Sequence, residues 1–359
     1  MASVFVSMWC LNTEFSPPKS APWPAWCLND LDAKLEYLEK LVGNAHQLAI
    51  KNNQSKVPDL HLFTAPEFLF ASHGWLKRID DILAGNNQKA KAALGKKYYE
   101  ICDFPYDEWS KQKIAAKIFS LGNDKRFPGL VLVPGTTFWK KAKFRVKPVE
   151  LEDEEGPYIR YTSPDDTRDM RKYITPGSAL PPVTASGGIN RSVQGDVVGK
   201  LTQKIKTIGS AVEERKIDVD KLISVRNSAF VGSSWGQWSY DKMFPDESEY
   251  AEVFTIFTPG KQSQAMNLGG LTMGIEVCAD HASGALRSQI KGEVDIHLIM
   301  SAYVSPEDSN FCTKKTGVTV FADTRKPNVY AGPTHEEVKS DWRYTVKEGG
   351  TLKQFQINM

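Results

Sequence analysis

The chain contains several short apolar runs that do not alternate with polar residues, and these runs limit the folds that it can adopt. The clearest is the run at residues 129–133 (GLVLV). A strand with one face in water alternates apolar and polar residues, whereas a strand covered on both faces is apolar along most of its length. Apolar residues at helical spacing fill the segment 31–48. Covered strands that alternate with helices predict an α/β fold in one domain.

The pattern also gives the positions of the expected elements. A helix is expected to begin near residue 30, where Asn29 or Asp30 can cap its first turn. Residues 76–122 are expected to be mostly helical, with interruptions at Gly85 and around Pro105. Strands are expected over 2–9, 60–63, 129–133, 136–141, 222–231, 273–277, 294–300 and 317–321, with a last strand in the polar C-terminal tail.

One long stretch breaks this pattern. Residues 146–195 hold a Glu/Asp run and many Pro and Gly residues, and they are followed by a helical segment at about 197–215. Long segments with few periodic apolar positions are typical of insertions and of lids over sites. We therefore expect a single domain over 1–359 with an insertion or lid at about 146–210.

Charge and cysteine usage exclude several classes of partner. The 45 basic and 43 acidic residues give a net charge of +2, which argues against nucleic acid or an anionic membrane as a partner. No run approaches the roughly 20 apolar residues that cross a bilayer. The N-terminus has no signal-peptide pattern, so a cytoplasmic protein is expected. The five cysteines are scattered and form no CxxC pair, so no metal, disulfide framework or other cofactor is predicted.

Cys278 is the first candidate for chemistry. It follows the apolar run 273–277 and precedes Ala279, Asp280 and His281, which places it at a predicted strand-to-helix turn. Backbone N–H groups at such a turn lower a thiol pKa and stabilise an oxyanion. The alternative is a buried core cysteine, and spacing alone leaves both interpretations open.

Glu67 and Lys242 are the other two candidates. Glu67 follows the apolar run 60–63 and a proline, where a partly buried carboxylate suits a general base. Lys242 lies in the segment 239–245 (SYDKMFP), and a lysine beside a thiol stabilises an oxyanion. On local grounds a solvated loop glutamate and an exposed lysine are the simpler interpretations.

Taken together and in this order, these residues resemble the nitrilase superfamily of carbon–nitrogen hydrolases, whose catalytic set is Glu, Lys and Cys. The similarity covers nearly the whole chain apart from the insertion. The motifs that carry it are the opening strand ASVFVSMW, the Pro-Glu pair of LHLFTAPE, the strand LVLVPGTTF, Asn227-Ser228-Ala229, YDKMF, FTPG, Gly274 to Asp280, and VDIHLIMS.

The resemblance implies a role for each matching residue. Glu67 would be the general base, Lys242 the lysine that stabilises the transition state, and Cys278 the nucleophile that forms a thioester. The backbone N–H of Ala279 would complete the oxyanion hole with Lys242. Glu252 would be the second glutamate, with Glu249 and Glu247 as rivals. The fold implied is a four-layer α-β-β-α sandwich, commonly paired into homodimers through helices.

The residues after the cysteine bear on the substrate. Nitrilases usually have Trp-Glu there, whereas amidase and carbamoylase branches have a residue and then Asp, as Cys278-Ala279-Asp280 does here. His281-Ala282-Ser283-Gly284 replaces the usual Arg-Phe-Pro, in a region that lines the substrate pocket in the family. Asp280 is therefore a candidate pocket residue. Tyr240 lies in a turn with Trp235 and Trp238, and these aromatic side chains either shape the pocket or pack within the fold. His281 either binds a polar or acidic substrate group or makes a capping bond at a helix start.

The predicted function is hydrolysis of a small carboxamide or carbamoyl substrate, with release of ammonia or an amine. Nitrile hydrolysis by the same three residues is the first alternative, and a catalytically silent binding scaffold is the second. A Cys-His hydrolase that uses His281 beside Cys278 is disfavoured, because two residues three apart at a turn rarely face each other as nucleophile and base.

Overall fold

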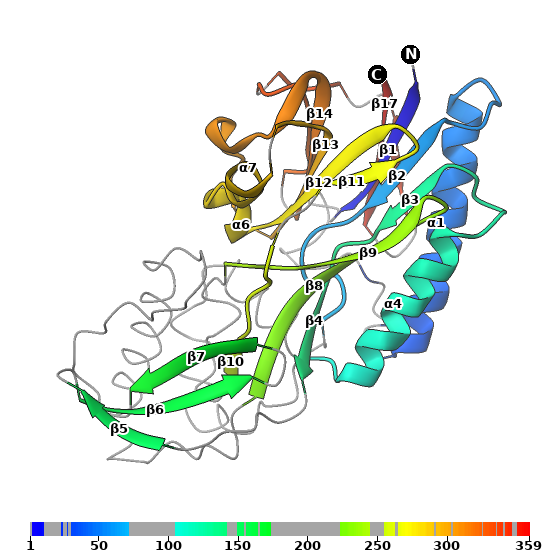
Figure 1. The fold of residues 1–359 in the computed structure, drawn as a ribbon. Helices are drawn as coiled ribbons and strands as arrows, with labels where there is room; N and C mark the ends of the chain where they lie inside the picture. The colour runs from blue at the N-terminus through cyan, green and yellow to red at the C-terminus, as the bar shows by residue number, and fades with distance from the viewer. Residues whose placement is uncertain are drawn as a thin grey trace, which may run out of the picture.

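The computed structural model describes residues 2–10, 23, 27, 30–71, 105–141, 149–153, 156–163, 166–173, 223–244, 255–262, 265–290, 292–302, 304–324, 326–334, 336–339, 342–346 and 350–359. Over these ranges the chain is a mixed α/β protein built on two large sheets (Figure 1). The predicted strands near 60, 130 and 294 all form, and every residue of each is buried.

The first sheet has parallel strands at its centre. Its core is β1 (Ser3–Cys10), β2 (Leu60–Thr64) and β3 (Leu130–Val133), which pair in parallel in that order. The strand order is β10-β8-β3-β2-β1-β17-β16, and β4 and β9 also pair with β8. The outer strands are β4 (Thr136–Lys141), β8 (Ile223–Ser233), β9 (Gly236–Asp241), β10 (Thr255–Phe257), β16 (Trp342–Thr345) and β17 (Thr351–Asn358).

Two helices cover one face of this sheet. They are α1 (Leu31–Asn52) and α4 (Glu108–Gly122), which lie on the same side in Figure 1. Asp30 caps α1 by accepting a hydrogen bond from the backbone N–H of Ala33, as predicted. The apolar stripe of α1 packs against Trp9, Phe63 and Leu130, because alternate residues of β1, β2 and β3 point toward the helices.

The second sheet packs on the other face of the first. Its order is β11-β12-β13-β14-β15, and the three central strands are parallel. The strands are β11 (Met266–Leu268), β12 (Leu271–Val277), β13 (Val294–Ser301), β14 (Thr313–Asp323) and β15 (Asn328–Ala331). Met273, Ile275 and Val277 of β12 share one apolar cluster with Val4 and Val6 of β1, so this cluster fills the space between the sheets.

Short helices cover the outer face of the second sheet. They are α6 (Ala279–Ala282) and α7 (Ala285–Gln289), and Leu286 of α7 lies directly over Gly274 of β12. The predicted α-β-β-α layering is therefore confirmed, with a fourth layer that consists of short helices within the described residues. The short outer strands β9, β10, β11, β15 and β16 were not predicted, because short strands carry a weak apolar pattern.

Part of the expected insertion folds as a sheet of its own. Strands β5 (Val149–Asp153), β6 (Gly156–Ser163) and β7 (Asp166–Tyr173) pair antiparallel in a third sheet. The rest of the expected insertion, the helix at 197–215 and residues 72–104 lie outside the described ranges, so the domain boundaries stay a prediction.

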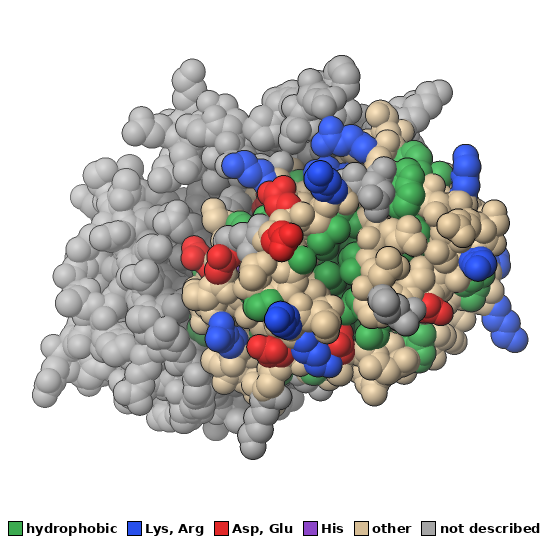
Figure 2. Space-filling model, turned by 90° about the horizontal axis from the view of Figure 1, so that it is seen from above, with side chains coloured by type: hydrophobic (Ala, Val, Ile, Leu, Met, Phe, Trp, Pro, Cys, Tyr) green, Lys and Arg blue, Asp and Glu red, His purple; other side chains and the backbone are tan. Residues whose placement is uncertain are grey.

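The surface agrees with the near balance of charge. Figure 2 shows Lys, Arg, Asp and Glu side chains interspersed over the described part of one face, with no broad field of one sign. Separately, the described helices include none with the length and apolarity that crossing a membrane requires.

Two buried histidines join α1 to the first sheet. Nδ1 of His46 lies 3.0 Å from Nδ1 of His61, whose Nε2 lies 2.8 Å from the hydroxyl of Ser7. Neither ring is exposed. Burial lowers the pKa of His46 to about 4, and burial together with the neighbouring His46 lowers the pKa of His61 to about 3. The pair is therefore neutral in the folded protein over most of the pH range.

We expect this pair to make the fold sensitive to mild acid. Both folded pKa values lie below the unfolded value of 6.5, so the unfolded chain binds protons first and stability is lost as the pH falls below 6.5. Each histidine should remove about 2 kcal/mol of unfolding free energy between about pH 7 and about pH 5. Urea unfolding at the two pH values measures this loss. His46→Gln keeps a hydrogen-bonding group but does not titrate, so it should roughly halve the pH dependence, and an unchanged slope would contradict the assignment.

Candidate active site

Glu67 lies in the loop that leaves β2, and its side chain has no exposure to solvent. The loop is held tightly against the start of β4. The backbone N–H of Phe68, a residue with φ of 58°, donates to the hydroxyl of Thr136 over 2.8 Å. A Cβ on Gly135, which has φ of +72°, would lie 2.2 Å from the carbonyl oxygen of Pro66. The turn after β3 therefore needs glycine, and the tight approach fixes the position of Glu67.

Glu67 forms a buried ion pair with Lys242. Nζ of Lys242 donates to Oε1 of Glu67 over 2.7 Å, and neither side chain is exposed. Nδ2 of Asn227 donates to the same oxygen over 2.9 Å. Two buried charges are stable together only when each is paired and further hydrogen-bonded, as the carboxylate is here. The structure thus joins two of the predicted residues and adds Asn227, to which the sequence motif alone gave no role.

The backbone on both sides of Lys242 is fixed by neighbouring segments. Its N–H donates to the carbonyl of Asn227 over 2.8 Å, and its carbonyl accepts from the N–H of Gly260 over 2.8 Å. A Cβ on Gly260 would lie 1.9 Å from the carbonyl oxygen of Asp241. The Phe-Thr-Pro-Gly turn is therefore a close backbone contact that holds the lysine in place.

Cys278 lies at a sharp turn between β12 and α6, as predicted. Its φ of 50° and ψ of −105° are a strained conformation for a residue with a side chain. Its N–H donates to the carbonyl of Met300 on β13 over 2.9 Å. Strand alternation would turn residue 278 away from Val277, yet both side chains belong to the cluster between the sheets. The strained turn thus directs the thiol toward the space between the two sheets.

Asp280 connects this turn to the segment after Lys242. Its Oδ1 accepts from the N–H groups of Met243 and Phe244 over 3.0 and 2.7 Å, and its Oδ2 accepts from the hydroxyl of Tyr240 over 2.7 Å. Burial raises the pKa of Asp280 to about 7, against the opposing attraction of Lys242. Asp280 and Tyr240, predicted as pocket residues, are therefore engaged with each other and with the backbone.

Ala279 and Glu252 are the two remaining residues that the resemblance predicts for the site. The side chain of Ala279 packs against the small cluster of Met243, Phe244 and Ala285, which brings the residue after the cysteine next to the segment that follows Lys242. Glu252 and its rivals Glu249 and Glu247 lie outside the described residues, so the second glutamate stays a prediction.

His281 corrects one expectation. Its Nδ1 lies 2.8 Å from Oε2 of Glu276, and its Nε2 accepts from the N–H of Glu307 over 3.0 Å. Both ring nitrogens are engaged on the outer face of the second sheet, so no nitrogen is left for a substrate, for a helix-start cap or for activating Cys278. The reason is the direction of the turn, which points the cysteine inward and the histidine outward.

The sequence interpretation assigned no role to Glu276 and His297, which lie on that outer face. A signal was present in the sequence: each is an ionisable residue between two apolar neighbours, Ile275 and Val277 for Glu276 and Ile296 and Leu298 for His297. Such a residue is buried only when it has partners.

Comparison with known proteins gives similarity in structure only. No protein-family model and no curated protein sequence matches the chain. A mutant of the Nesterenkonia AN1 amidase from the nitrilase superfamily is 11% identical with a TM-score of 0.43, covering 99% of this chain and 91% of that chain. Saccharomyces cerevisiae Nit3, a member of branch 10 of the nitrilase superfamily, is 12% identical with a TM-score of 0.45, covering 99% and 90%. An amidase from Nesterenkonia sp. is 10% identical with a TM-score of 0.40, covering 99% and 90%.

We expect Asp280→Ala to destabilise the protein by about 2–4 kcal/mol, because it leaves two buried backbone N–H groups without an acceptor. Asp280→Asn should cost less than about 1 kcal/mol. Its amide oxygen can still accept from Met243 and Phe244, while the hydroxyl of Tyr240 rotates to accept from the new amide. Urea unfolding measures the loss of stability in the two variants. If Asp280 only filled space and its hydrogen bonds did not matter, the two substitutions would destabilise the protein by similar amounts.

Proposed function

We propose that this chain is a carbon–nitrogen hydrolase of the nitrilase superfamily that hydrolyses a carboxamide or carbamoyl compound through a thioester on Cys278. The observation that carries the proposal is the buried Glu67–Lys242 pair, held next to the segment that Asp280 ties to the cysteine turn. Apolar residues of similar volume would stabilise the fold as well as a buried carboxylate–ammonium pair, so stability alone does not explain why this pair is present. With the strained cysteine on the turn that Asp280 connects to this segment, the pair suits a base and an oxyanion donor.

The proposed reaction runs in two halves. Glu67 accepts the thiol proton, and Sγ of Cys278 attacks the carbonyl carbon of the substrate. The negative charge on the carbonyl oxygen is held by Nζ of Lys242 and the N–H of Ala279. Glu67 returns its proton to the leaving nitrogen, which departs as ammonia or an amine. Glu67 then takes a proton from water, and the hydroxide attacks the thioester. The carbon–sulfur bond breaks, the acid product leaves, and Glu67 passes its proton to the sulfur, which restores the thiol.

The amide is favoured over the nitrile by the residues after the cysteine. Cys278-Ala279-Asp280 follows the amidase pattern of the resemblance, and Asp280 is occupied by three donors in the structure. Release of ammonia from paired amide and nitrile substrates tests this choice. Ammonia from nitriles and not from amides would overturn it. The homo-oligomer and the cytoplasmic location expected from the sequence stay predictions.

We expect Cys278→Ala to reduce kcat by at least about 10⁴-fold, the order found when a covalent nucleophile is removed. Glu67→Gln should reduce kcat by about 10²–10⁴-fold and Lys242→Ala by about 10²–10³-fold. Ammonia release from small carboxamides and N-carbamoyl compounds measures these changes. Cys10→Ala is the matched control, because Cys10 is a buried thiol at the end of β1 that should leave kcat unchanged.

Iodoacetamide labelling separates an enzyme from a silent scaffold. Burial raises the pKa of the Cys10 thiol to about 11, so that cysteine should stay unmodified near neutral pH. Selective modification of Cys278, read by mass spectrometry, is expected of a nucleophile. Equal resistance of both cysteines, with no hydrolysis of any substrate tried, would favour the scaffold.

A further inference from the structure

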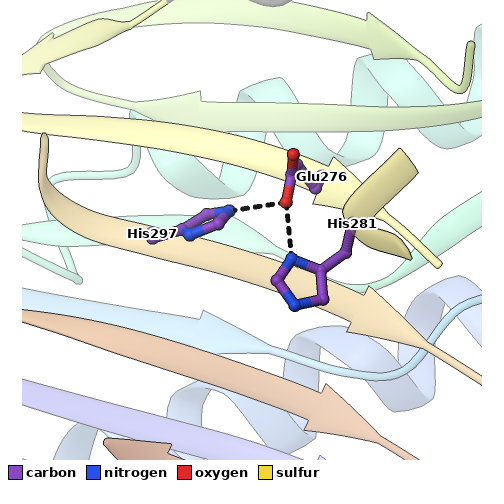
Figure 3. A group of neighbouring side chains, drawn as sticks. All are labelled: Glu276, His281 and His297. Carbon is purple, nitrogen blue, oxygen red and sulfur yellow. Dashed lines mark hydrogen bonds and ion pairs between the residues drawn. The ribbon is translucent and has the colours of Figure 1, made fainter. Parts of the chain in front are cut away.

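A second group of ionisable residues lies on the outer face of the second sheet, behind the cysteine turn. Figure 3 shows Glu276, His281 and His297 converging, with the two histidines directed at one carboxylate oxygen. Nδ1 of His281 lies 2.8 Å from Oε2 of Glu276, and Nε2 of His297 lies 2.9 Å from the same atom. All three side chains are completely buried. The proposed reaction uses none of them.

The backbone fixes where the protons of this group lie. The N–H of Glu307 donates to Nε2 of His281, and the N–H of Cys312 donates to Nδ1 of His297 over 3.2 Å. A nitrogen that accepts a hydrogen bond carries no proton, so each neutral ring has its proton on the nitrogen that faces Glu276. Both histidines therefore donate to the carboxylate.

The second carboxylate oxygen is also engaged. Oε1 of Glu276 accepts from the N–H of Leu286, in the first turn of α7, over 2.6 Å. Gly284 precedes that helix and has no side chain to cap it, so Glu276 acts as the cap. Burial by itself would raise the pKa of Glu276. The hydrogen bonds that both histidines donate act against burial and hold the pKa of Glu276 below its usual value.

The spacing of these three residues would also suit a metal ion, but the proton positions argue against one. Their ligand atoms lie within 4.8 Å of one another. A metal ion would have to displace the proton from each facing nitrogen. Each ring would then carry no proton, because its other nitrogen accepts from a backbone N–H. Histidines that bind metals instead donate the second ring proton to an acceptor.

The network surrounds the strained turn. Glu276 lies two residues before Cys278 and His281 three residues after it, so their hydrogen bond spans the turn. Leu286 extends the same contact into α7, and His297 anchors it to the neighbouring strand β13. A non-glycine residue at φ of 50° persists only where its surroundings hold it.

We propose that Glu276 is a positioning residue for Cys278, holding the turn through His281, His297 and the N–H of Leu286 so that the thiol and the Ala279 N–H keep their places. This inference rests on the proposed function, because it concerns the geometry of the proposed nucleophile. Misplacement of a reacting group by about 1 Å can reduce a rate about 100-fold. Loss of the network should therefore act on the chemical step and not on substrate binding.

The test compares variants that keep or remove one donor. Glu276→Gln places an amide where the two histidines and Leu286 all donate, and it should reduce kcat by about 100-fold with KM changed less than about threefold. His281→Ala should behave similarly. His281→Asn should restore most of the activity, because the amide nitrogen of asparagine can occupy the place of Nδ1. The rate of Cys278 alkylation by iodoacetamide should fall and recover in parallel with kcat.

Asp295→Asn is the matched control. Like Glu276→Gln, it changes a carboxylate of the second sheet to an amide. Asp295 lies on β13 at the end of the sheet opposite Cys278, where it contacts Thr272 and Lys314. It should leave kcat and the alkylation rate unchanged. Thermal unfolding of each variant shows which of them fold. If Glu276→Gln does not fold, the comparison of His281→Ala with His281→Asn still tests the proposal.

Each outcome decides a separate question. Full activity of Glu276→Gln or of His281→Ala would overturn the positioning role while leaving the hydrolase intact. Stoichiometric zinc, iron or manganese in the purified wild type, lost together with activity in His281→Asn, would replace it with a metal site. A wild type that neither hydrolyses amides nor alkylates at Cys278 would instead refute the proposed function.

Discussion

The candidate site depends on one tether between two sheets. Glu67 and Lys242 belong to the first sheet and its connections, whereas Cys278 ends a strand of the second. Apolar packing between the sheets is non-directional and does not by itself fix their relative position to a fraction of an ångström. The carboxylate of Asp280 does so, because its hydrogen bonds to Met243 and Phe244 have defined lengths and directions. The position of the thiol relative to the ion pair follows from those contacts.

Buried charge is concentrated around this tether. Glu67, Lys242, Glu276 and Asp280 have no exposed surface, and they lie within or next to two turns of the chain. Removing a charge from water is costly, and pairing recovers that cost only when the hydrogen bonds are well aligned. The described contacts are of that kind: Glu67 accepts from two donors and Asp280 and Glu276 from three each. Such networks contribute little net stability, but they permit one arrangement and exclude others.

The sequence was sufficient to predict the layers, because apolar strands and capped helices leave strong local patterns, whereas the catalytic roles of its three main candidates stay predictions. Asp30 and the runs near 60, 130 and 294 are examples. The direction in which a side chain points after a strained turn leaves no such pattern. The sequence therefore left His281 as either a pocket residue or a helix-start cap, whereas the structure directs its ring to the opposite face. The sequence also gave no role to Asn227, because its hydrogen bond to Glu67 joins residues that are 160 positions apart and leaves no local pattern.

The strained conformation of Cys278 explains why a carboxylate is found on each side of it. In a regular strand residue 278 would follow Gly274 and Glu276 to the outer face, and the thiol would lie beneath α7. A positive φ reverses this direction at a cost of about 1–3 kcal/mol. The chain would relax to a regular strand unless both flanks of the turn were held. Asp280 holds the flank toward Lys242, and Glu276 holds the flank toward α7. The two carboxylates are thus opposite supports of one strained residue, and the outer one is as much a part of the site as the inner one.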